Sequence, residues 1–420
     1  MNGSRIYRFP PSVMVQMEAG DTFSSQPAGA GQPLVAESAE VDMGRQAQAK
    51  RYARQRQMLS LVNLAVSAAL VGVLLVTPLG FALRDALAGA AGWQPLHGWH
   101  PFQVGAYFLV FFVAATLLTL PVSFYSGFVL AHRYTLSTQT VSGWTLDLLK
   151  GLLISLPFEL LAVELVYALL ALTPDTWWVW AGFAVLGVTV LLANIGPILL
   201  LPLFYKLAPL PDGEVRHMVQ MLAARAGTRV RGIYTMNMSK RTTAANAMVM
   251  GLGNTRRIVI SDTLLDRYTL DEIEVVLAHE LGHQVHKDIP KLILVEAVTM
   301  LGGLFAVNLA LHAAIGAVPG YAGLADAATL PLVAAALGIF GLVTLPITNG
   351  YSRHIEHQAD VYALESTGKT AAFISAMTRL ANQNLADLEP AWIIEFLLYN
   401  HPSTGRRLAY ARRREARDNA

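Results

Sequence analysis

Six long apolar segments constrain this chain more than any other feature of its sequence. A helix needs about 20 predominantly apolar residues to cross the hydrocarbon core of a bilayer. Segments of sufficient length are predicted at 58–83, 102–131, 150–172, 177–205, 291–318 and 327–350. Pro197 and Pro202 are expected to bend or end the fourth segment. One such segment is compatible with a buried helix of a soluble protein, but six in one chain predict a multi-pass protein of the lipid bilayer.

The composition agrees with membrane insertion and removes several classes of function. Hydrophobic residues make up 54% of the chain and charged residues only 14%, which is too apolar for an ordinary soluble domain. There is no cysteine, so disulfides, thiolate metal ligands and a cysteine nucleophile are excluded. The net charge is only +2 and the Lys and Arg residues form no long basic stripe, so no nucleic-acid partner is expected.

Basic residues beside the predicted spans indicate the orientation of the chain, because loops rich in Lys and Arg stay in the cytoplasm. They gather before the first span, between the second and third spans, and after the fourth: Lys50, Arg51, Arg54, Arg56, Arg133, Lys150, Lys206, Arg216, Arg225, Lys240 and Arg241. The alternate loops, around 84–101, 173–176 and 319–326, contain one arginine, Arg84, and no lysine. Both termini and the polar segment 206–290 are therefore predicted on the cytoplasmic side.

The spans divide the chain into five parts. Residues 1–50 are rich in Gly, Ser, Ala, Gln and Pro and are predicted to be a disordered tail. Residues 51–205 hold four spans, and residues 291–350 hold two more. The polar parts, 206–290 and 351–420, are predicted to form one domain outside the bilayer.

The segment 206–290 mixes strand-like and helical patterns. Three stretches, RGIYTMN, AANAMVMGL and RRIVISDTLL, are predicted as short strands, with Gly251 and Gly253 marking a hairpin. A helix is predicted to begin after Thr269 and Asp271 and to run through EIEVVLAHELGHQVHKD, ending before Pro290. This helix carries the strongest chemical signal in the chain.

That signal is the motif HELGH at residues 279–283. His279 and His283 share one face of the predicted helix, so both imidazoles can reach one Zn²⁺ at about 2.0–2.1 Å. Glu280 is then placed beside the open coordination position, where it can take a proton from the attacking water. Two surface histidines on an ordinary helix are the alternative, which the complete motif disfavours.

Catalytic zinc normally takes three protein ligands, so a third must be found. His286 shares the stripe of His279 and His283, but it lies about 10.5 Å from His279 along the helix axis and cannot reach the same ion. The metzincin pattern is excluded as well, because Ile289 stands where that pattern needs a histidine. The third ligand must therefore come from another part of the chain.

The best source is YSRHIEHQADVYAL, a polar and helix-compatible segment just after the last span. Glu356 is a candidate ligand, but His354 and His357 compete for the same role on residue type alone. Asp360 lies one turn beyond Glu356, where it can hydrogen-bond a ligand imidazole. These residues by themselves leave the third ligand open.

Several stretches of the chain together resemble one known family. They are HELGH, SRHIEHQAD, SKRTTAANAMVMGLGNTRRIVISDTLL and HPSTGRRL, with AHRYTLSTQTVSGWTLDLLK and PLFYKLAPLPDGE between the spans. In this order, over roughly residues 100–410, they resemble the type I CAAX prenyl endopeptidases, which are integral-membrane zinc peptidases of the gluzincin group. The resemblance implies that Glu356 is the third ligand of one zinc ion per chain.

The resemblance also implies roles toward the substrate. The strand within AANAMVMGL would hold a peptide or protein substrate as an added β-strand, with Asn246, Ala247 and Met248 as its contacts. His401 and Arg407 match the late histidine and arginine that stabilise the tetrahedral oxyanion. The family further implies a prenylated C-terminal peptide as substrate.

The implied fold is mainly α. It is a polytopic barrel or bundle of transmembrane helices around a water-filled chamber, with a cytoplasmic zinc-metalloprotease domain of the α+β type that contains a small edge sheet. Polar residues within the spans are then expected to line the chamber: Glu159, Glu164, Asn194 and Glu296.

The chain departs from the family's pattern at several positions. Ala244 and Asp288 stand where the family usually has histidine, Met248 where it has tyrosine, and Thr135 where it has glycine. Eukaryotic members have seven spans, and the span missing here would lie near the N-terminus. None of the expected zinc ligands is lost.

The resulting hypothesis is an integral-membrane zinc metalloendopeptidase that removes the C-terminal tripeptide after a prenylated cysteine. A membrane quality-control protease without a prenyl requirement uses the same chemistry and is the first alternative. A catalytically silent membrane scaffold or transporter is the alternative from another class, and its mark would be a broken ligand set.

Overall fold

The computed structural model describes residues 40–91 and 99–419, without the side chains of 89–91. Most of the predicted tail, 1–50, lies outside the described residues. Its last part differs from the prediction, because helix α1 (Met43–Val76) begins within it. The side chain of Asp42 accepts a hydrogen bond from the backbone N–H of Arg45 and caps the helix, while Gln46 and Ala49 are buried.

Six helical segments of the described chain are long and apolar enough to cross a membrane, which confirms the predicted number. They are α1, α3 (Pro101–Phe124) with its continuation through η1 (Tyr125–Val129) and α4 (Leu130–Arg133), α5 (Val141–Leu172), α6 (Trp177–Leu199), α11 (Asp288–Ala317), and α12 (Leu330–Thr367) with the preceding η4 (Ala327–Thr329).

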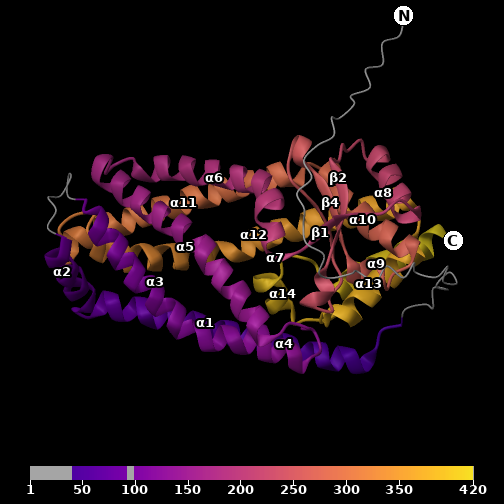
Figure 1. Cartoon of the computed structure of the whole chain (residues 1–420), viewed down its shortest axis with the longest axis horizontal. Coiled ribbons are helices and arrows are strands. Elements are labelled where there is room, and N and C mark those ends of the chain that lie inside the picture. Colours follow the sequence, from indigo (N-terminus) through magenta and orange to yellow (C-terminus); the bar gives the residue numbers. More distant parts are fainter. Residues whose placement is uncertain (1–39, 92–98, 420) are drawn as a thin grey trace, which may run out of the picture. The chain divides into compact units, whose positions relative to one another are not determined.

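These six segments form a closed ring. Helix α1 contacts α3, α3 contacts α5, α5 contacts α6, α6 contacts α11, α11 contacts α12, and α12 returns to α1. Several of them run lengthwise beside one another in Figure 1. The chain therefore has the helical membrane chamber that the resemblance implies.

The ends of the spans differ from the predicted ranges at three places. The first, predicted at 58–83, is divided at Thr77, because Pro78 cannot continue the backbone hydrogen bonds of α1. Helix α2 (Leu79–Ala91) follows, but its 13 residues are too few to cross a bilayer. The fourth ends at Leu199, before a short α7 (Leu201–Phe204), and the last continues as one helix to Thr367.

A four-stranded sheet follows the fourth span. Its strands are β1 (Leu207–Pro209), β2 (Gly232–Met236), β3 (Ala247–Met250) and β4 (Arg257–Ser261), in the order β1-β2-β4-β3. Strands β2 and β4 are parallel, and the other two pairings are antiparallel. Gly251 and Gly253 turn the chain between β3 and β4 with φ of 89° and 53°, as the predicted hairpin requires. Strand β3 lies at one edge of the sheet.

Helices of the protease domain pack around the sheet and around one another (Figure 1). These helices are α8 (Glu214–Arg225), α9 (Asp262–Leu265), α10 (Leu270–Val285), α13 (Thr370–Asn384), α14 (Trp392–Leu398) and α15 (Thr404–Asp418). Two short turns, η2 (Met238–Lys240) and η3 (Gly253–Thr255), lie among the strands. Their shared core includes Ile258 and Ile260 of β4, Leu277 and Leu281 of α10, and Phe373 of α13. Helix α10 is central, because it contacts α8, β3, α12 and α13.

Helix α10 begins as predicted and ends earlier than predicted. At its start, the Thr269 hydroxyl accepts from the Glu272 N–H at 3.3 Å, and the Glu272 carboxylate accepts from the Thr269 N–H at 2.8 Å. The expected helix to Pro290 is interrupted at Lys287, whose φ of 56° is left-handed. Helix α11 starts at the next residue, Asp288, so the HELGH helix and a membrane span are joined by one sharp turn.

Candidate metal centre

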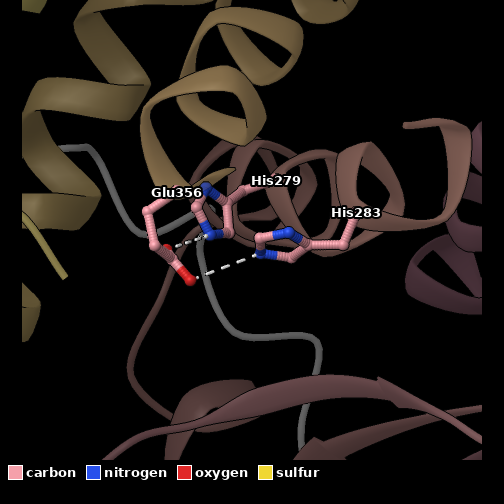
Figure 2. A group of neighbouring side chains, drawn as sticks. All are labelled: His279, His283 and Glu356. Carbon is pink, nitrogen blue, oxygen red and sulfur yellow. Dashed lines mark ion pairs between the residues drawn. The ribbon is translucent and has the colours of Figure 1, made fainter. Parts of the chain in front are cut away.

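Three side chains from two helices converge in the described part of the chain. Figure 2 shows His279 and His283 of α10 facing Glu356 of α12. Nε2 of His279 lies 3.2 Å from Oε2 of Glu356, and Nε2 of His283 lies 3.6 Å from Oε1. One donor atom from each of the three lies within 4.8 Å of the other two, which is a possible metal site.

The two helices meet closely because of the glycine inside HELGH. A Cβ atom on Gly282 would lie 3.2 Å from Cα of Ala359 and 3.2 Å from the Tyr362 ring. Larger side chains at residue 282 would therefore separate α10 from α12. The spacing of HELGH thus places two ligands on one face and also allows the third helix-borne ligand to approach them.

Each histidine of the site has a carboxylate behind it. Nδ1 of His279 lies 2.9 Å from Oδ1 of Asp360, and Nδ1 of His283 lies 3.1 Å from Oδ2 of Asp288. Both aspartates are about 1% exposed. With a proton on each Nδ1 donated to its carboxylate, Nε2 of both histidines would be available to bind a metal ion at the centre of the site.

This arrangement suits a divalent cation. Oε2 of Glu356 is buried, and its close polar contact in the described chain is the ion pair with Nε2 of His279 at 3.2 Å. Burial opposes the charged form of His279, but hydrogen bonds to Asp360 and Glu356 outweigh it and raise the pKa of His279 to about 9. The surrounding carboxylates therefore favour positive charge at this position, and two imidazoles with one carboxylate are the donor set typical of a catalytic zinc peptidase.

Glu280 lies beside this cluster and lines a cavity of about 390 Å³. Burial raises the pKa of its carboxyl group, which positive charge on His279 and His283 and a backbone hydrogen bond with Val249 oppose. A cation at the three ligands would also oppose this rise in the pKa of Glu280. The carboxyl thus stands next to the possible metal site and opposite the edge strand β3.

The same cavity brings together most of the other predicted site residues. Asn246, just before β3, and Ala247, the first residue of β3, line one side of it. His401 lines it from the loop before α15, and Arg407 lines it from α15. Met248 follows Ala247 on β3, but it does not line the cavity and pairs with Val259 of β4 instead. The predicted contact with Met248 is therefore the weakest part of the predicted site.

His401 and Arg407 have different surroundings. Nε2 of His401 lies 3.1 Å from Oε1 of Glu356, and the ring is half exposed to solvent. Arg407 is turned toward Asp360, with Nε 2.8 Å from Oδ2 and Nη2 2.5 Å from Oδ1. Arg407 thus stands behind His279 and acts on the cluster through Asp360.

The competing ligands lie elsewhere. His286 stacks edge-on against Tyr362, with ring centroids 6.0 Å apart. His354 contacts Gln358, and His357 packs against the Tyr410 ring at 4.7 Å. None of the three belongs to the cluster that includes Glu356.

Asp288 is the residue of the site that the sequence interpretation did not identify. In the sequence it is only a departure from the family pattern, but in the structure it contacts His283 and lies 3.1 Å from Lys291. A helix running to Pro290 would carry Asp288 away from His283. The left-handed Lys287 reverses the chain and brings the aspartate back, and no local pattern announces that conformation in a lysine.

Two family models match almost the whole chain. The model of the CAAX prenyl protease N-terminal region, described as five membrane helices, matches residues 35–206, and the model of peptidase family M48 matches residues 209–415. The fold and the site define an integral-membrane metallopeptidase. The chain belongs to the CAAX prenyl protease family of M48 peptidases.

Individual relatives agree with this assignment. An uncharacterized metalloprotease of Bacillus subtilis, YhfN, is 27% identical over 370 residues, covering 87% of this chain and 85% of the relative. CAAX prenyl protease 1 of Saccharomyces cerevisiae is 35% identical over 40% of this chain and 38% of the relative. The human CAAX prenyl protease 1 homolog is 26% identical over 71% of this chain and 72% of its own length.

A solved structure shows the shared fold. The crystal structure of Ste24p from S. mikatae matches with a TM-score of 0.75 at 24% identity, covering 88% of this chain and 89% of that chain. Within residues 40–206, the described part has four candidate spans, and the short α2 adds a fifth helix. Helix α2 lies in the region where a further span was expected to be missing.

Proposed function

We propose that this chain is a zinc endopeptidase that uses His279, His283 and Glu356 as metal ligands. The observation that supports it is the convergence of three ligand atoms within 4.8 Å, with His279 lining the same cavity as Glu280. An intact ligand set of this kind has no purpose in a silent scaffold or a transporter. When bound, the zinc ion supplies a Lewis acid that polarises the scissile carbonyl and acidifies the attacking water.

The chain's own residues perform the proton transfers and orient the groups. Glu280 takes a proton from the attacking water and passes it to the leaving amine. His401, at 3.1 Å from Glu356, is placed to offset negative charge on the tetrahedral oxyanion. Arg407 holds Asp360, and Asp360 holds the Nδ1 proton of His279, so we assign Arg407 a positioning role as well as the oxyanion role implied by resemblance.

The edge strand β3 is the proposed substrate platform. It pairs with β4 on one side only, and Asn246 and Ala247 line the cavity that holds Glu280. An extended peptide added to this edge would gain main-chain hydrogen bonds and present a peptide bond to Glu280. The free edge also explains why the cleavage would require an unfolded segment rather than a folded domain.

A prenylated C-terminal peptide is the proposed substrate, as in the name of the yeast and human relatives.

The site and both termini are proposed to face the cytoplasm, since basic residues gather on that side. Arg84, the one arginine on the other side, is neutralised there. Its Nη1 lies 2.6 Å from Asp326, its Nη2 lies 2.8 Å from Asp85, and its contact with Gly320 O is 2.7 Å.

The test is cleavage of a fluorogenic farnesylated CAAX peptide by the purified, detergent-solubilised protein. The unprenylated twin peptide, a zinc chelator and the variant Glu280→Gln are run in parallel, with His217→Gln on α8 as a histidine control outside the cluster. Chelator-sensitive cleavage that requires the prenyl group supports the proposal. Equal cleavage of both peptides would assign a quality-control protease instead, and no cleavage by a zinc-loaded protein would contradict peptidase activity on this class of substrate.

A further inference from the structure

A second cavity lies on the other side of Arg407 from the proposed active site. It has a volume of about 510 Å³ and shares only Arg407 and Pro402 with the cavity that contains Glu280. One wall is a face of α12 that carries Gly350, Arg353, His354 and His357. The facing wall is α15, and α14 contributes Glu395.

The lining of this cavity is strongly basic. It contains four arginines, Arg353, Arg406, Arg407 and Arg413, against two carboxylates, Asp360 and Glu395. Arg407 is paired with Asp360, and Arg406 lies 3.3 Å from Glu395. Arg353 and Arg413 have no ion pair within the described chain, and Arg353 donates instead to carbonyl oxygens at the end of α14. Two guanidinium groups without a carboxylate partner and two exposed histidines thus line one open cavity.

The position of the cavity along α12 indicates which layer of the bilayer it lies in. The apolar part of this helix ends at Thr348, and Gly350 to His357 extend about 10 Å further at about 1.5 Å per residue. The polar headgroup layer of a bilayer is about 5–7 Å thick on each side of the hydrocarbon core. The basic lining therefore starts at headgroup level.

An apolar helix lies next to the basic cavity. Trp392 and Phe396 of α14 are 71% and 47% exposed, and α14 packs on α12 beside the cavity. Exposed tryptophan and phenylalanine on a short helix at the end of a span are typical of the membrane interface. The cavity thus has exposed apolar side chains beside it.

We propose that the cavity between α12, α14 and α15 binds the phosphate of an anionic phospholipid headgroup. Arg353 and Arg413 bind the phosphate oxygens, and the acyl chains lie along α14. Guanidinium groups suit this ligand, because their planar donors match phosphate oxygens in pairs. Basic pockets at the end of transmembrane helices are where acidic headgroups bind. The lipid stands behind Arg407 and Pro402, so it also supports the rear of the peptidase cavity.

The test is native mass spectrometry of the full-length protein with phosphatidylglycerol and, separately, phosphatidylcholine. We expect a phosphatidylglycerol adduct that phosphatidylcholine does not give. Arg413→Gln should weaken it about fivefold, since each basic residue near an anionic surface contributes modestly to binding. Arg413→Glu should weaken it more. Arg412→Gln is the matched control, because Arg412 is exposed on the same helix but does not line the cavity.

Several outcomes would overturn the proposal. Equal binding of both lipids, or equal weakening by the Arg412 and Arg413 substitutions, would mean that no specific site exists. Displacement of the lipid by inorganic phosphate at equal concentration would assign the cavity to a free anion, and displacement by a peptide with a free C-terminal carboxylate would assign it to substrate. Unfolding midpoints and metal content, measured on each variant, show that the variants remain folded. Lipid binding is read directly, so the result is independent of peptidase activity.

Discussion

The membrane ring exposes many apolar side chains on its surface, whereas the protease domain buries them in its core. In the ring, Leu153 is 74% and Val343 is 66% exposed, as expected of side chains that face lipid. In the protease domain, Leu277 and Leu281 are at most 1% exposed. Helix α12 belongs to both regions, because it crosses the membrane and then enters the core with Glu356. Precise packing is therefore expected to matter near the metal site, whereas the outer face of the ring needs only to be apolar.

The largest effect is expected at Glu280. Glu280→Gln keeps the shape of the side chain and the three ligands but removes the group that accepts the proton, so turnover should fall about 10²–10⁴-fold. Metal content, measured by elemental analysis, should remain near one zinc per chain. Glu415→Gln on α15 is the control and should keep full activity. Full activity of Glu280→Gln would remove the proposed base.

The two carboxylates behind the histidines come next. Asp360→Asn and Asp288→Asn should each weaken zinc binding by about 10–100-fold, measured by competition with a chelator. Asp360 should have the larger effect, because its substitution also leaves the Arg407 guanidinium without its partner. An Asp288 variant with unchanged zinc affinity would show that the contact with His283 is not functional.

A smaller effect is expected from added volume between α10 and α12. Gly282→Ala forces a Cβ against Ala359, which should lower the free energy of unfolding by about 1–2 kcal/mol after the gain in helix propensity is subtracted. Gly187→Ala in α6 is the matched control, because no atom lies within 4 Å of its Cβ position. Thermal unfolding of both variants in detergent compares the two regions directly. An equal midpoint for both would contradict the tight contact.

The smallest effect is expected on the lipid-facing side of the ring. Leu153→Val should change the free energy of unfolding by less than about 0.5 kcal/mol, because an apolar side chain still meets lipid. Leu281→Ala in the protease core should cost about 2–5 kcal/mol by the same measurement. If the two substitutions were equally damaging, the proposed contrast between the regions would fail.

Local patterns predicted more of the fold than of the site. Hydropathy predicts the six spans because apolar length is a property of each segment, and the periodicity of HELGH predicts two ligands because both lie on one helix. Glu356 required contact between α10 and α12, which no single segment encodes, so residue type alone left His354 and His357 as rivals. The resemblance to a family resolved that choice.

Two features depended on backbone geometry and were not predicted. The break at Lys287 requires a left-handed lysine, which single-sequence propensities disfavour. The sequence pattern therefore predicts the HELGH helix as too long and gives no signal that Asp288 contacts His283. The early start of α1 at Met43 likewise depends on tertiary contacts of Gln46 and Arg45 with the chain around Asn382 and Ala386.

The turn at Lys287 also joins the helix of the proposed metal site directly to a membrane span. Asp288, which holds His283, is the first residue of one span, and Glu356 is carried by another. Spans tilt when the hydrocarbon layer becomes thinner or thicker than their apolar length. Tilting α11 against α12 would change the separation of His283 and Glu356, so the thickness of the surrounding membrane would alter the geometry of the proposed metal ligands.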